Sequence, residues 1–191
     1  MADDDRTELE ITDPVALRAL AHPARQQLIT ELFAGEVLTA TEAAEIVGLT
    51  PSATSYHLRA LEKFGIVTRG EASTDARQRP WRAVADSISV QPEALRGAGR
   101  ATSLATMTEW FSDMDAGLAR SLRAIEAGVD DVGHTSRGRL WLTESEVTDL
   151  RDRLIGIVRE YEGRTRGDHP EDARLWDVYS ALLPAEDRPD A

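Results

Sequence analysis

The sequence of 191 residues predicts a mainly α-helical fold with small β elements, divided into an N-terminal and a C-terminal domain. Apolar residues recur at helical spacing along most of the chain, and short runs rich in β-branched and aromatic residues are typical of strands. A segment with Pro92, Gly97 and Gly99 separates the two apolar-rich regions. We therefore expect an acidic disordered tail at 1–12, a domain at 13–85, a junction at 86–100, a second domain at 101–184 and a disordered tail at 185–191.

Composition excludes several classes of protein. The chain has no cysteine, and its four histidines, at 22, 57, 134 and 169, have neither metal-ligand nor catalytic-triad spacing. There is no glycine-rich phosphate loop, so we expect no metal, no cofactor and no enzymatic activity. No segment approaches the ~20 apolar residues of a membrane span, and the acidic start does not resemble a signal peptide. These features favour a cytoplasmic protein.

The N-terminal domain is predicted to begin with two helices. Pro14 opens the first, which ends before Pro23 because the residue before a proline avoids helical geometry. The second continues to Phe33 and is ended by Gly35. We interpret His22 as a turn residue at the break rather than as a metal ligand.

A helix, a tight turn and a second helix follow. The first helix spans 41–47 and the second 51–64. Gly48 can adopt the left-handed conformation that ends a helix. Thr50 can accept hydrogen bonds from free amides of the next helix. Pro51 lacks a backbone N–H, which costs nothing in the first turn of a helix because that N–H would have no partner within the helix. Such a short connection makes the helices cross steeply, as in a helix-turn-helix.

The second helix has a buried side and a polar side. Leu58 and Leu61 face inward, whereas the other side carries Ser52, Ser55, Tyr56, Arg59 and Lys63. A polar side of this kind can enter a DNA major groove. His57 lies at the margin, where it either packs against the domain or contacts a base. The alternative is an ordinary helical hairpin with a solvated face.

A β-hairpin is predicted after Gly65. Residues 66–69 and 81–84 form its strands, and the polar loop 70–80 joins them. With its arginines, the hairpin completes a winged helix. Trp81 is interpreted as a core anchor. The candidate DNA-contacting residues are therefore Pro51, Ser52, Ser55, Tyr56, His57, Arg59, Lys63, Arg69, Arg77 and Arg79.

Residues 13–85 resemble the DNA-binding domain of the arsenical-repressor (ArsR) type of bacterial winged-helix regulators. The resemblance is carried by Leu20-Ala21-His22-Pro23-Ala24-Arg25, Glu45-Ile46-Val47-Gly48-Leu49, Ser55-Tyr56-His57-Leu58 and Gly65-Ile66-Val67. It implies a DNA-binding transcription regulator. The chain lacks the cysteine pair of the metal-sensing members, and its long helix after the wing lacks histidine. Metal sensing is therefore not implied.

A long helix over 102–127 is predicted to mediate dimerisation. Apolar residues recur at steps of three and four, as in a coiled coil. This seam can pair with a second copy of the chain or pack on its own domain. Pairing would present two recognition helices about 34 Å apart, as a twofold DNA site requires. The candidate dimerisation residues are Leu104, Met107, Phe111, Met114, Leu118 and Leu122.

The rest of the C-terminal domain is predicted to be a helix between two strands. The strands span 138–143 and 174–183, and Thr143 with Glu146 forms a capping box for the helix that runs to about Gly163. Several aromatic residues either form core and interface or line a pocket for a small apolar effector. The candidate pocket residues are Trp110, Trp141, Tyr161, Trp176 and Tyr179.

Charge distribution bears on the choice of function. The net charge of -12 argues against DNA binding, but residues 50–85 hold six basic and three acidic residues. The sequence therefore favours a homodimeric regulator, in particular a repressor, that binds a pseudo-palindromic site in double-stranded DNA. The alternative is a winged-helix module that binds a protein partner and no DNA.

Overall fold

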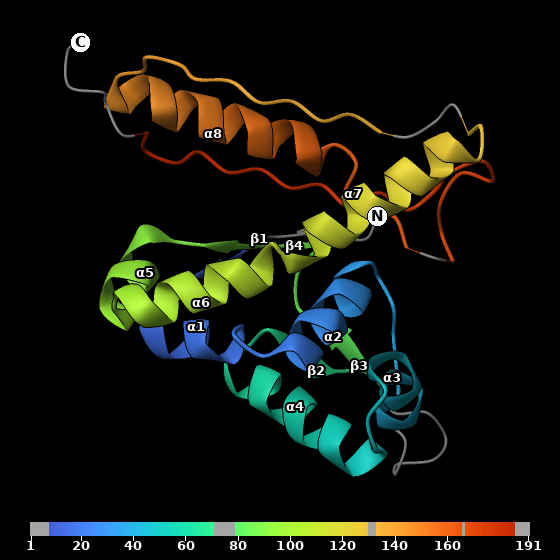
Figure 1. The fold of residues 1–191 in the computed structure, drawn as a ribbon. Coiled ribbons are helices and arrows are strands. Elements are labelled where there is room, and N and C mark those ends of the chain that lie inside the picture. The colour runs from blue at the N-terminus through green and yellow to red at the C-terminus, as the bar shows by residue number, and fades with distance from the viewer. Residues whose placement is uncertain (1–7, 71–78, 130–132, 166, 186–191) are drawn as a thin grey trace, which may run out of the picture. The chain divides into compact units, whose positions relative to one another are not determined.

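The computed structural model describes residues 8–70, 79–129, 133–165 and 167–185. Contacts divide the chain into two compact units, one of Met1–Asp113 with Glu162–Leu175 and one of Met114–Tyr161 with Trp176–Ala191. The described elements, coloured along the chain in Figure 1, are β1 (Glu8–Ile11), α1 (Pro14–Ala19), α2 (Pro23–Phe33), α3 (Ala40–Val47), α4 (Pro51–Lys63), β2 (Val67–Arg69), β3 (Trp81–Ala83), β4 (Ser87–Val90), α5 (Pro92–Ala98), α6 (Arg100–Trp110), α7 (Ser112–Glu126) and α8 (Glu144–Arg159).

The helix-turn-helix forms as the sequence predicts. α3 starts with a capping box in which the Thr39 hydroxyl and the Glu42 carboxylate each accept from the other residue's backbone amide. Gly48 ends α3 in the left-handed conformation, with φ 65°. Thr50 then caps α4, accepting from the amide of Ala53 at 3.3 Å. These local caps fix where both helices begin and end.

The wing is an antiparallel hairpin of β2 and β3. Val67 pairs with Ala83 and Arg69 with Trp81. Residue Leu38 extends the hairpin: its amide donates to the Trp81 carbonyl at 2.9 Å and its carbonyl accepts from the Trp81 amide at 2.7 Å. The hairpin is therefore joined to the segment that leads into α3.

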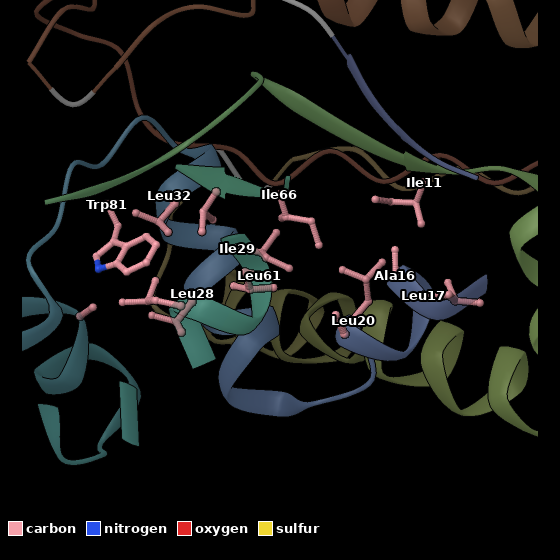
Figure 2. Packing of buried hydrophobic residues seen from close by; sticks show 14 of the residues in the cluster. Ile11, Ala16, Leu17, Leu20, Leu28, Ile29, Leu32, Leu61, Ile66 and Trp81 are labelled. Atoms are coloured by element: carbon pink, nitrogen blue, oxygen red, sulfur yellow. The ribbon is translucent and has the colours of Figure 1, made fainter. Parts of the chain in front are cut away.

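One core holds the N-terminal unit together. Leucines of α1, α2 and α4 meet Ile66 and the indole of Trp81, all with essentially no exposure (Figure 2). The prediction that Trp81 anchors the hairpin is thus confirmed. The core includes the inner side of α4, so burial fixes which side of that helix faces outward. The most deeply buried members are Leu17, Leu20, Leu28, Leu32, Leu58, Leu61, Ile66, Val67 and Trp81.

The acidic N-terminal segment is not wholly a tail, which corrects one expectation. Residues Glu8 to Ile11 form β1, which pairs in parallel with β4. Leu9 packs partly buried against the core, and Ile11 is 3% exposed. The alternation of glutamate with leucine and isoleucine is a strand pattern, and β4 supplies the partner. The segment expected to be a junction contains β4 and α5.

The predicted long helix over 102–127 is broken at Phe111. The Ser112 hydroxyl donates to the carbonyl of Glu109 at 2.7 Å, a side-chain bond that competes with the helical ladder. α6 then belongs to the N-terminal unit, where Met107 and Trp110 pack against the core. The predicted seam is therefore divided: Met107 on α6 packs against the chain's own core, whereas Leu104 and the seam residues of α7 are exposed.

The second unit is helical, without the predicted strands. Residues 138–143 and 174–183 are extended but pair with no described segment, and unpaired strands are not stable alone. The capping box of α8 is confirmed, with the Glu146 amide donating to Thr143 Oγ1 at 3.3 Å and the Thr143 amide donating to Glu146 Oε2 at 2.8 Å. Among the described residues of this unit, none is buried. As a single copy it lacks a core.

Candidate nucleic-acid interface

Helix α4 presents its polar side outward. Thr54, His57, Leu58 and Leu61 are buried, which leaves the opposite side to the predicted reading residues. Tyr56 is 63% exposed, and Ser52, Arg59 and Lys63 are also exposed, whereas Ser55 is half-buried. The first turn contains no acidic residue. The outer side of α4 therefore offers hydroxyls and cations, the groups that contact base edges and phosphates.

A recess of about 490 Å³ joins α4 to the wing. We call it the wing-side recess. Its lining includes Ser55 and Arg59 of α4, Arg69 of β2, and Arg79 just before β3. The beginning of α3 closes it, where Glu42 is the acidic lining residue. The structure thus brings four of the predicted DNA-contacting residues, from two separate segments of the chain, to one surface.

Arg69 is held in place by three neighbours. Its guanidinium carbon lies 3.6 Å from the centre of the Trp81 ring, a cation-π stack. One nitrogen donates to the Arg79 carbonyl at 3.2 Å, and Nε lies 3.9 Å from a Glu62 carboxylate oxygen. The buried tryptophan therefore orients the first arginine of the wing.

His57 is the exception among the predicted DNA contacts. It is 9% exposed, with its ring centre 4.4 Å from that of His22 and 5.5 Å from that of Tyr56. Its position on the helix turns it toward α2 rather than outward. His57 therefore packs within the domain and is not a candidate DNA contact. His22 has the predicted turn role: its Nδ1 accepts from the Ala24 amide and caps α2.

The buried position of His57 has a consequence for stability. Burial, and then the positive charges of His22 and Arg25, lower the pKa of His57. The unfolded chain then binds a proton more readily than the folded chain, so the free energy of unfolding decreases as the pH falls below about 6.5. Urea denaturation of the wild type and His57→Leu between about pH 7.5 and 5 should show a smaller pH dependence in the variant. Equal pH dependence would contradict this assignment.

Arg77 lies outside the described residues, and Pro51 occupies the exposed first turn of α4. The predicted dimerisation residues separate by unit. Met107 and Phe111 are half-buried in the N-terminal unit, whereas Leu104 is 64% exposed. On α7, Met114, Leu118 and Leu122 are about half exposed.

The predicted aromatic pocket is not assembled within either unit. Trp110 packs against the core of the N-terminal unit, and the other four aromatic residues belong to the second. There, Trp141 is 88% exposed, Tyr161 62% and Trp176 51%. Side chains this exposed in a single chain do not enclose an effector, because the sheet expected to gather them does not form.

The described part of the chain has neither a cluster of metal-ligating side chains nor a helix suited to spanning a membrane. It contains no group of three or more His, Cys, Asp or Glu side chains placed to hold a metal ion. No described helix is both long and apolar enough to cross a bilayer.

Comparison with known proteins bears on the region around α4. A family model described as a helix-turn-helix domain matches residues 20–69, from the end of α1 through β2. The hairpin of β2 and β3 supplies the wing. The chain contains a winged helix-turn-helix domain. We call residues 13–85 the winged domain. The matched description does not mention the arsenical-repressor type, and a search of curated proteins found no match.

Several solved structures of bacterial proteins show a detectable likeness to this chain. They include a ZitR mutant of Lactococcus lactis in apo form, with TM-score 0.30 and 16% identity over 72% of this chain and 81% of that chain. The adhesin competence repressor of Streptococcus pyogenes gives 0.31 and 15% over 73% and 80%. A MarR family protein of Mycobacterium tuberculosis, in complex with salicylic acid, gives 0.29 and 21% over 76% and 87%. Likeness of this degree carries no argument about function, which we draw from the chain's own residues.

Sequence reasoning missed Arg18 and Arg25, which lie beside α4 in the folded domain. Both line a recess together with Tyr56, Arg59 and Lys63. The position of Arg18 on the outer side of a predicted amphipathic helix was visible in the sequence. Its proximity to α4 depends on how the helices pack, for which the sequence offered no local signal.

Proposed function

We propose that this protein is a transcription regulator that binds double-stranded DNA through α4 and the wing. The observation that carries the proposal is the wing-side recess, where Ser55 and Arg59 of the outer side of α4 lie beside Arg69 and Arg79. In a winged helix the second helix of the motif enters the major groove while other basic residues reach the backbone. Ser52, Ser55 and Tyr56 are the proposed base-reading residues, and the arginines and Lys63 grip phosphates.

The net charge of -12 is compatible with this proposal because the charge is unevenly placed. The winged domain contains eight acidic and eight basic residues, and the acidic excess lies elsewhere in the chain. At a Debye length of roughly 8 Å, distant acids are largely screened from the α4 surface. The acidic remainder should reduce indiscriminate binding to DNA, so affinity should depend on base contacts and on dimerisation.

We further propose that the regulator is a homodimer. Support comes from the second unit, where Leu118, Leu122 and Ile125 of α7 are each 51–53% exposed and no described residue is buried. Helices with an apolar side and no core of their own are stabilised by a partner helix. A second copy would cover these residues and place two winged domains on a pseudo-palindromic site.

The finer assignments extend the same proposal. The protein is a repressor of the arsenical-repressor type, without the cysteine pair of the metal-sensing members. The exposed aromatic residues Trp141, Tyr161 and Trp176 belong either to the dimer interface or to a pocket for a small apolar effector, completed only in the dimer. The protein acts in the cytoplasm, where bacterial DNA is accessible.

Salt dependence separates this function from its alternative, a winged-helix module that binds only protein. Fluorescence anisotropy with a duplex of random sequence would give the affinity between about 50 and 200 mM salt. The logarithm of the association constant should fall linearly with the logarithm of salt, with a slope of about -0.9 for each phosphate contacted. Undetectable or salt-independent binding would favour the protein-interaction module.

A further inference from the structure

A second recess lies on the other side of α4 from the wing-side recess. We call it the basic recess and define it by Arg18 of α1, Arg25 of α2, and Arg59 and Lys63 of α4. It measures about 620 Å³, and apolar side chains, among them Val15 and Phe64, complete its lining. Figure 1 shows the three helices that contribute to it. Arg59 lines both recesses, so it stands between them.

Among the described residues, the four cations of the basic recess have no anionic partner. No acidic residue lines the recess, and none of the four forms an ion pair with any described residue. Some arginines elsewhere do form ion pairs: Arg69 approaches Glu62, and Arg120 bonds Asp177 at 3.2 Å. In a chain with 34 acidic and 22 basic residues, four unpaired cations around one hollow indicate an external anion.

Local contacts hold two of these cations while leaving donors free. Arg25 is half-buried and donates from one terminal nitrogen to the carbonyl of Ala19 at 3.2 Å. Arg59 donates from Nε to the carbonyl of Ser55 at 3.0 Å, which leaves its terminal nitrogens available. An arginine fixed through one nitrogen loses less rotamer freedom when the others bind an anion.

We propose that the basic recess grips the DNA backbone on the flank of the major groove opposite the wing. The inference rests on the proposed function. A helix in the major groove, about 12 Å wide, is flanked by the phosphates of both strands. Arg69 and Arg79 serve the wing flank, and Arg18, Arg25 and Lys63 serve the other. Residues outside the helix-turn-helix thereby fix the orientation of α4 in the groove.

The openness of the recess favours DNA over a small anionic ligand. Val15 remains 52% exposed and Tyr56 63% exposed, although both line it. A pocket for a small ligand normally buries most of the ligand surface. A backbone strand needs only an open, charged track with apolar patches for its sugars.

Arg18→Ala is the test variant, because Arg18 is exposed and its side chain forms no hydrogen bond or ion pair with a described residue. Arg25→Ala is less suitable, because it would also remove the hydrogen bond from Arg25 to the carbonyl of Ala19 and so affect the stability of the fold. The variant's affinity should fall several-fold for the DNA site that the wild type selects from a random duplex pool. Its affinity for a scrambled duplex should fall by the same factor. The salt slope should become about 0.9 less steep, so that raising the salt from about 50 to 200 mM costs the variant roughly threefold less affinity than the wild type.

Two further variants complete the experiment. Arg18→Lys keeps the charge and should restore the wild-type slope, whereas Arg96→Ala, an exposed arginine on α5 that does not line the recess, should change nothing. A wild-type slope in Arg18→Ala would overturn the inference while the proposed function stood. A loss confined to the selected site would also overturn it, because phosphate contacts carry no sequence preference. If the wild type itself bound no duplex, the proposed function would fail, and the inference with it.

Discussion

Replacing Trp81 by alanine is expected to lower the free energy of unfolding of the winged domain by about 3 to 5 kcal/mol. The indole side chain has no exposed surface, and the backbone amide and carbonyl of Trp81 each form a hydrogen bond with Leu38. Removing it leaves a cavity between the hairpin and α2, where Leu28 and Leu32 belong to the same core. It also removes the ring on which Arg69 is stacked. Urea denaturation followed by circular dichroism measures the change.

Trp141→Ala is the matched control for this prediction. It deletes the same side chain at a position that is 88% exposed in the second unit. Exposed substitutions generally change stability by about 0.5 kcal/mol or less. A loss below about 1 kcal/mol for Trp81→Ala would show that the tryptophan is not the anchor of the wing.

The double variant Leu118→Asp and Leu122→Asp is expected to be monomeric and to lose most of its affinity for a full palindromic site. Burying a leucine contributes about 1.5 to 3 kcal/mol, and a dimer would bury four of these side chains, two from each copy. Because about half of each side chain is already covered in the single chain, their loss removes about 3 to 6 kcal/mol. Burying carboxylates in an apolar seam adds a further penalty, so little remains of the roughly 8 kcal/mol that holds a micromolar dimer. Sedimentation equilibrium measures the mass, and gel shift measures the affinity.

Ala116→Asp with Arg123→Asp controls for added negative charge on the same helix. Both positions are exposed, and around α7 Ala116 lies about 160° and Arg123 about 140° from Leu118, away from the apolar side. This control should remain a dimer. If the Leu118→Asp and Leu122→Asp variant remained a dimer, the interface would lie elsewhere. If the wild type bound DNA as a monomer, the proposed homodimer would be wrong.

The sequence predicted those parts of the fold that are encoded locally. The left-handed Gly48 and the pair Thr50-Pro51 fix the turn between α3 and α4 within four residues, and the structure has the caps that these residues predict. The hairpin was predictable for the same reason, since Gly65 precedes β2 and the polar loop that ends at Pro80 precedes β3. The outer side of α4 followed from the spacing of Leu58 and Leu61.

What the sequence did not reveal depends on contacts between distant segments. β1 exists because β4, whose partner residues lie 79 positions along the chain from Glu8 and Ile11, offers a strand edge. His57 could be placed only when α4 was packed beside His22. Arg18 joined the candidate site only when α1 was set against α4. In each case the local residues allowed more than one outcome, and tertiary packing selected between them.

The C-terminal strands fail for a related reason. Residues 138–143 carry Leu140 and Trp141, which favour an extended chain but form a sheet only with a partner strand. In the described chain no such partner is paired with them. Their apolar side chains stay exposed, as does the apolar side of α7.

The most direct test of DNA recognition is selection of bound sequences from a random duplex pool at near-physiological salt, with no added metal or ligand. The wild type should enrich an inverted repeat whose half-site centres lie about one helical turn apart. Ser55→Ala with Tyr56→Ala, which leaves the caps and core of α4 intact, should lose that enrichment while remaining a dimer. No enrichment by the wild type, or the same repeat from the variant, would contradict the assignment of α4 as the reading helix.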